Sequence, residues 1–144
     1  MVPVVKTSGS LGMHVAAPVD AGATFGDTRR YARDLAEALA AATPDEVIAR
    51  SERASRPGRV YVDWVQNHRG RQLVAPWSPR ATAIPRVSLP LAWDEVERLA
   101  AGAGGHPDVG FDRALRRMRT SGGLWLDGRP TVAASGQEPV DLGG

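Results

Sequence analysis

The sequence predicts an α/β fold, a partly antiparallel sheet with packed helices, and three observations support this. Residues 60–65, Val-Tyr-Val-Asp-Trp-Val, are rich in the β-branched and aromatic side chains that favour strands. Tyr31, Leu35 and Leu39 recur at four-residue spacing, which is typical of the apolar stripe of an amphipathic helix. A polar, glycine-rich loop at residues 6–12 separates two short apolar runs, and this pattern favours two strands joined by a loop.

The first third of the chain predicts two strands followed by a helix. Residues Val2–Val5 are predicted as the end of a strand that runs into the polar loop, and Met13–Pro18 as the strand that leaves it. Asp27 or Thr28 is suited to cap a helix over Arg29–Ala42, because its side-chain oxygen can accept a hydrogen bond from a free backbone N–H. The helix should end at the Thr-Pro dipeptide that follows, since a residue before proline disfavours helical geometry.

The middle of the chain predicts a short helix and a β-hairpin. The short helix is expected at residues 45–50. The hairpin would pair the strand at residues 60–65 with a second strand at 72–76, through a turn at 67–71. The proline-punctuated segment 76–90 is expected to be extended.

The last third predicts two helices separated by a link. A helix is expected at Trp93–Ala101, with its acidic residues near the positive end of the helix dipole. Residues 102–110 should form a flexible link, and Phe111–Met118 a short basic amphipathic helix, for which an exposed surface position is favoured over DNA reading. Residues 121–144 are expected to be weakly ordered.

Composition limits the class of protein. A chain of 144 residues fits one domain, and its lack of cysteine excludes disulfides and thiolate metal sites and favours an intracellular protein. No segment has the length of a membrane-spanning helix or the pattern of a signal peptide. The net charge is only +2, but residues 50–86 carry eight arginines against two acids. This basic middle suits a polyanionic partner, although an arginine-rich surface from a biased genome explains it equally well, because lysine occurs once beside 17 arginines.

Two features are candidates for a nucleotide site on their own chemistry. The hydroxyls and backbone N–H groups of the loop Thr7–Gly12 suit phosphate oxygens. Asp63 lies inside an apolar strand pattern, where a buried carboxylate suits a divalent metal bound to those phosphates. Simpler alternatives are an ordinary Ser/Gly turn for the loop, a satisfied strand-end histidine for His14, and an ion pair with a neighbouring arginine for Asp63.

Four segments in this order resemble one family. They are Lys6–His14, Val60–Asn67, Val74–Arg80 and Ser88–Val96. Their sequences and spacing are similar to the polymerase (primase-polymerase) domain of bacterial ATP-dependent DNA ligase D, a member of the archaeo-eukaryotic primase superfamily. The resemblance implies that residues 1–101 are the C-terminal half of such a domain, the second half of a primase-polymerase core. Residues 102–144 would then be the linker, the basic helix and the tail.

The resemblance also implies roles for individual residues. Ser8 and His14 match the Ser-x-His motif that contacts the incoming nucleoside triphosphate. Asp63 matches the third acidic metal ligand of the catalytic centre, and Gln66 a position that contacts nucleotide or template. Arg80 matches a basic residue that pairs with the triphosphate. A hydroxyl, an imidazole N–H and a guanidinium are suitable donors to a polyphosphate.

Two departures from the family pattern stand out. Leu11 lies where members of the family commonly carry lysine or arginine, so the loop lacks a positive charge. The larger departure is that no Asp-x-Asp motif occurs in the chain, so two of the three metal-binding carboxylates are absent. One carboxylate does not hold two Mn²⁺ or Mg²⁺ ions. We therefore expect part of a repair polymerase that fills gaps and extends ends by nucleotidyl transfer but is inactive alone. The alternative is a non-catalytic nucleotide- or DNA-end-binding module, or a remnant.

Several partners follow from the same resemblance. They are a nucleoside triphosphate, DNA ends or a primer-template, and an N-terminal half, a ligase module or an end-binding protein. The expected location is the bacterial cytoplasm, on the nucleoid, with no membrane association. Lys6, Arg69 and Arg71 are candidates for contacts to the DNA backbone, although a solvated turn at 68–71 is equally consistent. Tryptophans 64, 77 and 93 could stack on bases, but core packing is favoured for Trp64 and Trp93.

Overall fold

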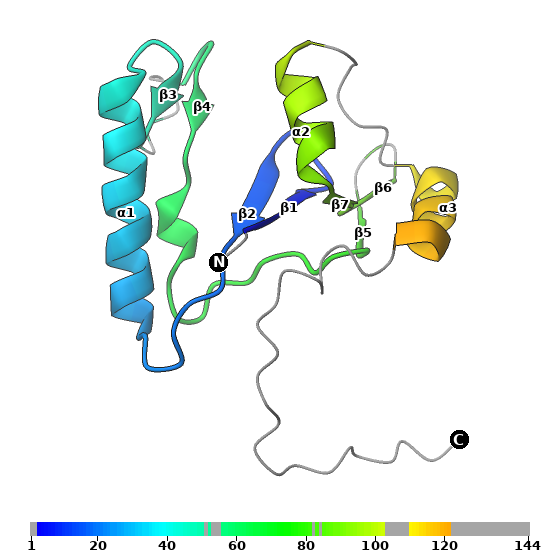
Figure 1. The fold of residues 1–144 in the computed structure, drawn as a ribbon, viewed down its shortest axis with the longest axis horizontal. Helices are drawn as coiled ribbons and strands as arrows, with labels where there is room; N and C mark the ends of the chain where they lie inside the picture. The colour runs from blue at the N-terminus through cyan, green and yellow to red at the C-terminus, as the bar shows by residue number, and fades with distance from the viewer. Residues whose placement is uncertain are drawn as a thin grey trace. The chain divides into compact units, whose positions relative to one another are not determined.

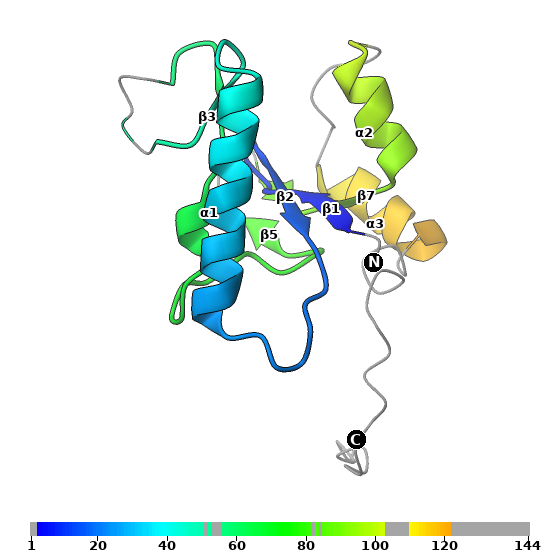
Figure 2. The ribbon, with the colours of Figure 1, turned by 60° about the vertical axis from the view of Figure 1, so that its left-hand side comes forward.

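A computed structural model describes residues 3–50, 52, 56–81, 83, 85–102 and 110–121, and the chain divides into two compact units. We call Met1–Pro18 together with Val74–Gly144 the sheet unit, and Val19–Leu73 the helical unit. Figure 1 shows their elements, and Figure 2 shows them from a second direction.

A three-stranded antiparallel sheet forms the centre of the sheet unit. Its order is β2-β1-β7, so β1 (Val4–Thr7) lies between β2 (Met13–Ala16) and β7 (Pro90–Leu91). Lys6 on the central strand is opposite His14 on one side and Pro90 on the other. The antiparallel pairing of the two amino-terminal strands agrees with the predicted strand–loop–strand unit, and the observed first strand continues two residues further than expected.

The predicted extended segment 76–90 contains two further short strands. Strands β5 (Pro79–Arg80) and β6 (Arg86–Val87) form an antiparallel pair. Val87, Leu89 and Ala114 are buried together, and Trp77 packs against this cluster. Trp77 therefore serves the core of this unit, and it adopts a left-handed backbone conformation, with φ of 65°, at the turn before β5.

Two helices lie in the described part of the sheet unit, and both begin where the sequence predicted; the second ends three residues later than expected and packs Ala114 into the core. Helix α2 (Trp93–Ala100) begins shortly after β7. Helix α3 (Phe111–Ser121) contacts β6, which it lies beside in Figure 1, and its Arg117 donates to the Pro90 carbonyl of β7. The Glu95 carboxylate accepts a hydrogen bond from the backbone N–H of Ala92 at 2.8 Å, which caps α2, and it forms an ion pair with Arg117 of α3. The indole of Trp93 donates to the carbonyl of Pro3 at 2.8 Å. The predicted link and tail fall largely outside the described residues.

The helical unit is built on helix α1 (Phe25–Ala42), which starts four residues earlier than predicted. The cap is Thr24 rather than Asp27 or Thr28: Asp27 donates its backbone N–H to the Thr24 hydroxyl at 3.2 Å, and its carboxylate accepts the Thr24 backbone N–H at 3.0 Å. This reciprocal capping box satisfies two N-terminal donors at once. Tyr31, Leu35 and Leu39, which form the expected apolar stripe, are exposed. The buried residue of the helix is instead Ala36.

Two sequence predictions for this unit were wrong. Residues 45–50 do not form a helix; Val47–Ile48 is strand β3. It pairs in parallel with β4 (Val60–Tyr61), so the predicted hairpin between 60–65 and 72–76 is also wrong. β-Branched side chains favour this pairing, and the backbone then turns into a short 3₁₀ helix, η2 (Trp64–Gln66), which cuts the strand short after Tyr61. Among the described helices, none has the length and apolarity needed to cross a bilayer.

Candidate nucleotide-phosphate site

The loop between β1 and β2 is held closed by Ser8. Its hydroxyl oxygen accepts the backbone N–H groups of Ser10 and Gly12, at 3.1 and 3.2 Å, and its own N–H donates to the Gly12 carbonyl at 2.8 Å. The sequence predicted backbone N–H groups turned toward a phosphate, but three of them, those of Ser8, Ser10 and Gly12, form hydrogen bonds inside the loop. What the loop offers instead is the hydroxyl proton of Ser8, since the oxygen already accepts two bonds. Leu11 at the tip is 83% exposed.

Arg80 lies against this loop through a glycine. Gly9 has φ of 71°, and a Cβ at that position would overlap the Arg80 side chain. Glycine is therefore required there both for the left-handed backbone and for the close approach of β5. On the neighbouring strand, Arg86 donates to the Ser10 carbonyl at 3.4 Å. Two guanidinium groups thus border the loop that the sequence analysis singled out.

A buried lysine connects the loop to the sheet. The Lys6 side chain is only 1% exposed, and its Nζ donates to the Ser88 hydroxyl at 2.7 Å and lies 3.0 Å from Nδ1 of His14. Ser88 in turn donates to the carbonyl of Thr7 at 2.7 Å. Burial, reinforced by the positive charge of Arg80, lowers the pKa of Lys6 from 10.5 to about 8. The burial of Lys6 argues against the DNA contact predicted for it.

Replacing Lys6 with methionine should change how stability depends on pH. The folded chain binds the Lys6 proton more weakly than the unfolded chain, so the free energy of unfolding of the wild type should rise between about pH 8 and pH 10.5. This rise should be absent in Lys6→Met. Because the apolar side chain has no charge to desolvate, the variant should be more stable near pH 7 by about 1–3 kcal/mol.

Urea unfolding of both proteins from pH 7 to 10.5 tests this prediction. The difference between their free energies of unfolding at each pH gives the contribution of Lys6. Parallel profiles would show that the ammonium is not desolvated in the folded chain.

The remaining predicted site residues lie in the helical unit. Asp63 stands at the start of η2, after β4, and it is exposed rather than buried as the sequence predicted. The Tyr61 hydroxyl and the Gln66 amide lie within hydrogen-bond reach of its two oxygens, at 3.3 and 3.4 Å. Partial burial and the Asp63 charge raise the pKa of Tyr61. Arg69 and Arg71 are exposed on the turn that follows.

The structure therefore separates the predicted residues into two groups. Ser8, His14 and Arg80 belong to the sheet unit, whereas Asp63 and Gln66 belong to the helical unit. Within the described part of the chain, no cluster of three or more His, Asp or Glu side chains could hold a metal ion. Asp63 is thus a single exposed carboxylate, and the described residues do not by themselves fit the two-metal centre that the resemblance implies.

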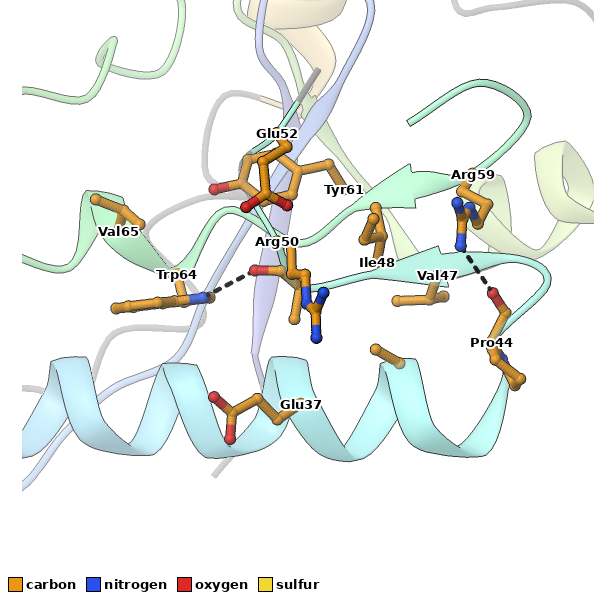
Figure 3. A pocket seen from close by; sticks show the side chains of 12 residues that line it. Glu37, Pro44, Val47, Ile48, Arg50, Glu52, Arg59, Tyr61, Trp64 and Val65 are labelled. Atoms are coloured by element: carbon orange, nitrogen blue, oxygen red, sulfur yellow. Dashed lines mark hydrogen bonds between the residues drawn. The ribbon is translucent and has the colours of Figure 1, made fainter. Parts of the chain in front are cut away.

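The helical unit contains an open pocket of about 750 Å³, shown in Figure 3. Its walls come from the end of α1, from β3 and from β4, and its charged lining residues are Glu37, Arg50, Glu52 and Arg59. At its edge the Trp64 indole donates to the Ala49 carbonyl at 3.1 Å (Figure 3). The guanidinium of Arg29 lies over the half-buried Trp64 ring, 5.3 Å from its centroid.

Comparison with known proteins identifies the family. The sequence model of the LigD primase-polymerase domain matches residues 1–125. The chain belongs to the LigD primase-polymerase domain family. A solved structure, the polymerase domain from Mycobacterium tuberculosis ligase D in complex with DNA, is similar to it with a TM-score of 0.76 and 30% sequence identity. That match covers 84% of this chain and 40% of the solved domain. The resemblance stated from the sequence and the α/β fold are thereby confirmed.

Curated relatives are much longer than this chain. The multifunctional non-homologous end joining DNA repair protein LigD of Mycobacterium tuberculosis is 31% identical over 124 residues, which is 86% of this chain and 16% of the relative. The LigD protein of Pseudomonas aeruginosa is 33% identical over 95 residues, 66% of this chain and 11% of the relative. The chain therefore spans less than half of the solved LigD polymerase domain and a small part of whole LigD proteins.

Ser88 is a site residue that the sequence analysis did not single out. It is fully buried between Lys6 and the Thr7 carbonyl. Its position in the apolar run Val87–Leu91 could have identified it, because a hydroxyl group within a buried segment requires a hydrogen-bond partner. The pattern does not show that the partner is a lysine 82 residues away.

Proposed function

We propose that this chain binds the triphosphate of a nucleotide and supplies that side of a LigD-type primase-polymerase site. The observation that carries the proposal is that Ser8, His14 and Arg80, which match three triphosphate-contacting positions of the family, lie in one unit around a single closed loop. The reaction of the complete site would be nucleotidyl transfer onto a 3′-hydroxyl during DNA end joining.

The binding chemistry follows from the donors on this face. A hydroxyl proton from Ser8, an imidazole N–H from His14 and the fork of the Arg80 guanidinium would each donate to phosphate oxygens. The rigid part is the sheet, because Lys6 and His14 lie on paired strands, and the loop is fixed by its own hydrogen bonds. Such preorganised donors stabilise charge without further reorganisation when the ligand arrives.

The metal part of the site would be shared with another polypeptide segment. Asp63 would contribute one carboxylate toward Mn²⁺ or Mg²⁺, and Gln66 would contact nucleotide or template. Since the chain contains no Asp-x-Asp motif, the other carboxylates must come from elsewhere, and this chain alone should not extend a primer. DNA is the second proposed partner, through the exposed turn with Arg69 and Arg71, on the basis of its charge and the DNA-bound structural relative.

The missing carboxylate pair also supports a second candidate function. A chain that keeps the triphosphate-binding residues but not the Asp-x-Asp pair could act as a non-catalytic module that holds a nucleotide or a DNA end. The polymerase part and a module that holds a nucleotide both require triphosphate binding, whereas a module that holds only a DNA end does not. The two candidates differ in whether addition of a polypeptide that carries the carboxylate pair yields primer extension.

Calorimetric titration with ATP and Mn²⁺ tests the proposal, and Arg80→Ala should weaken binding by about 30-fold. That loss corresponds to roughly 2 kcal/mol, the range of a hydrogen bond between charged groups. Arg113→Ala is the matched control, because it removes the same group from an exposed position on α3 and should change affinity less than twofold. Saturable binding that Arg80→Ala leaves untouched would refute the site.

A gain of affinity is expected from Leu11→Lys. The wild-type side chain is exposed at the loop tip, where the family commonly carries a positive charge. A lysine there should tighten ATP binding about three- to tenfold at low salt, and the gain should shrink as salt screens the charge. Leu11→Gln, which is polar but uncharged, is the control. Equal affinity of the lysine and glutamine variants would show that the loop tip does not face the phosphates.

A further inference from the structure

We propose that Lys6 is a positioning residue that holds His14 in the tautomer whose proton is on Nε2, so that the ring can donate to a phosphate oxygen. The inference concerns the site of the proposed function and rests on it for its consequence in binding. Its structural part, a lysine that sets a histidine tautomer, stands on the geometry of the sheet.

The two residues are placed together by strand pairing. Lys6 and His14 are directly opposite each other on β1 and β2, so their side chains lie on the same face of the sheet. The separation between Lys6 Nζ and His14 Nδ1 is 3.0 Å, which is a hydrogen bond. Because β1 is the central strand, paired on both sides, the lysine starts from a fixed backbone position.

The chemistry of an ammonium group decides the direction of that bond. Lysine in its charged form carries three donors and no acceptor. The nitrogen it contacts must therefore accept, which requires an unprotonated Nδ1 and places the proton of the neutral ring on Nε2. A serine or a water molecule at the same place would not fix the tautomer, since either can donate or accept.

A second contact holds the ammonium in place. Lys6 donates to the Ser88 hydroxyl, which in turn donates a hydrogen bond to the Thr7 carbonyl at 2.7 Å. The Thr7 hydroxyl accepts the backbone N–H of Leu89 at 2.9 Å. The lysine is thus part of a buried polar network that joins β1 to the segment before β7, and its side chain has little freedom to leave Nδ1.

The free-energy cost of burying the Lys6 ammonium indicates that this residue has a role other than stabilising the fold. A buried ammonium is expensive to desolvate, which is why the pKa of Lys6 falls to about 8. An apolar side chain on the central strand would stabilise the sheet at least as well. Near neutral pH the lysine nevertheless remains mostly charged, and in that state it can only donate.

Imidazole ¹H–¹⁵N correlation spectra of the full chain at pH 7, without any ligand, test the structural part. His14 is assigned by the loss of its signals in His14→Ala. In the wild type we expect the pattern of the Nε2–H tautomer, and in Lys6→Met a mixture of both tautomers. An unchanged His14 pattern in Lys6→Met overturns the inference. Since the apolar variant should remain folded, the spectrum reports on the bond rather than on unfolding.

A double-mutant cycle with inorganic tripolyphosphate as the probe tests the consequence for binding. Lys6→Met and His14→Ala should each weaken binding about tenfold, and the double variant should be no more than twofold weaker than His14→Ala. Arg113→Met, which removes a distant exposed charge, should change affinity less than twofold.

Additive losses in the cycle would mean that Lys6 acts through its own charge, and they would overturn the positioning role. If the wild type fails to bind tripolyphosphate at all, the proposed function is wrong, while the spectra still decide whether Lys6 sets the tautomer of His14.

Discussion

Glu95→Ala is expected to destabilise the docking of α3 by about 3 kcal/mol, the largest effect on stability that we expect from one substitution in the sheet unit. Glu95 has two roles. It accepts the Ala92 backbone N–H and so caps α2, and it forms a two-pronged ion pair with Arg117, in which one contact is 2.6 Å long. Arg117 also donates to the Pro90 carbonyl at 3.0 Å. Removal of the carboxylate leaves a half-buried guanidinium without its counter-charge and α2 without its cap.

Hydrogen exchange of the α3 amides measures this effect locally. Exchange of the α3 amides should be faster by about a hundredfold in Glu95→Ala. Glu97→Ala, at an exposed position of α2, is the control and should change the exchange rate less than threefold. Equal protection of α3 in both variants would show that the ion pair does not hold the helix.

The same carboxylate predicts an acid limit of stability. Hydrogen bonds from Arg117 hold the pKa of Glu95 below its ordinary value of 4.5. The folded state therefore binds the proton more weakly than the unfolded state, so the stabilisation is fully present above pH 4.5 and is lost as the pH falls through the lowered value. Protection of α3 should fall below pH 4.5 in the wild type and stay flat in Glu95→Ala.

The purified chain is expected to self-associate through the apolar stripe of α1. Tyr31, Leu35 and Leu39 are 70%, 47% and 42% exposed, and their spacing places them on one face of the helix. An apolar stripe that is exposed in the isolated chain is typical of a surface that binds another protein surface. The solved LigD polymerase domain is more than twice as long as the part matched by this chain, so additional polypeptide is available in that relative to cover such a face.

Sedimentation velocity across a concentration series tests the expectation. Leu35→Glu should weaken association at least tenfold, because it places a charge in the middle of the apolar stripe. Glu37→Gln, on the same helix but outside the stripe, is the control. A wild type that remains monomeric at high concentration would contradict the role assigned to this face.

Short motifs were more predictable from the sequence than pairing between strands. The loop at Lys6–His14 and the helices after residues 92 and 110 follow from local signals, and the structure has them where expected. The strand pairing of the helical unit was not predictable, because Val47–Ile48 is two residues long and its parallel partner lies beyond an intervening segment. Local sequence carries no signal for such a non-local pairing.

The site was predictable in its residue types but not in its internal connections. Ser8, His14 and Arg80 came from the resemblance, and the structure adds how they are held. These connections join segments about 70–80 residues apart in the sequence. Lys6 is buried against Ser88, and the absence of a side chain at Gly9 leaves space for Arg80. Asp63 was expected to be buried because its neighbours are apolar, yet the backbone turn at η2 exposes it.

We propose that the triphosphate binds at the loop of the sheet unit. Amide chemical-shift mapping of the ¹⁵N-labelled chain during titration with inorganic tripolyphosphate tests it most directly. We predict that the largest shifts fall on Ser8–Gly12, His14 and Arg80, and that Arg80→Ala reduces them. Shifts confined to the pocket of the helical unit, around Val47 and Tyr61, would show that the triphosphate does not bind at this loop.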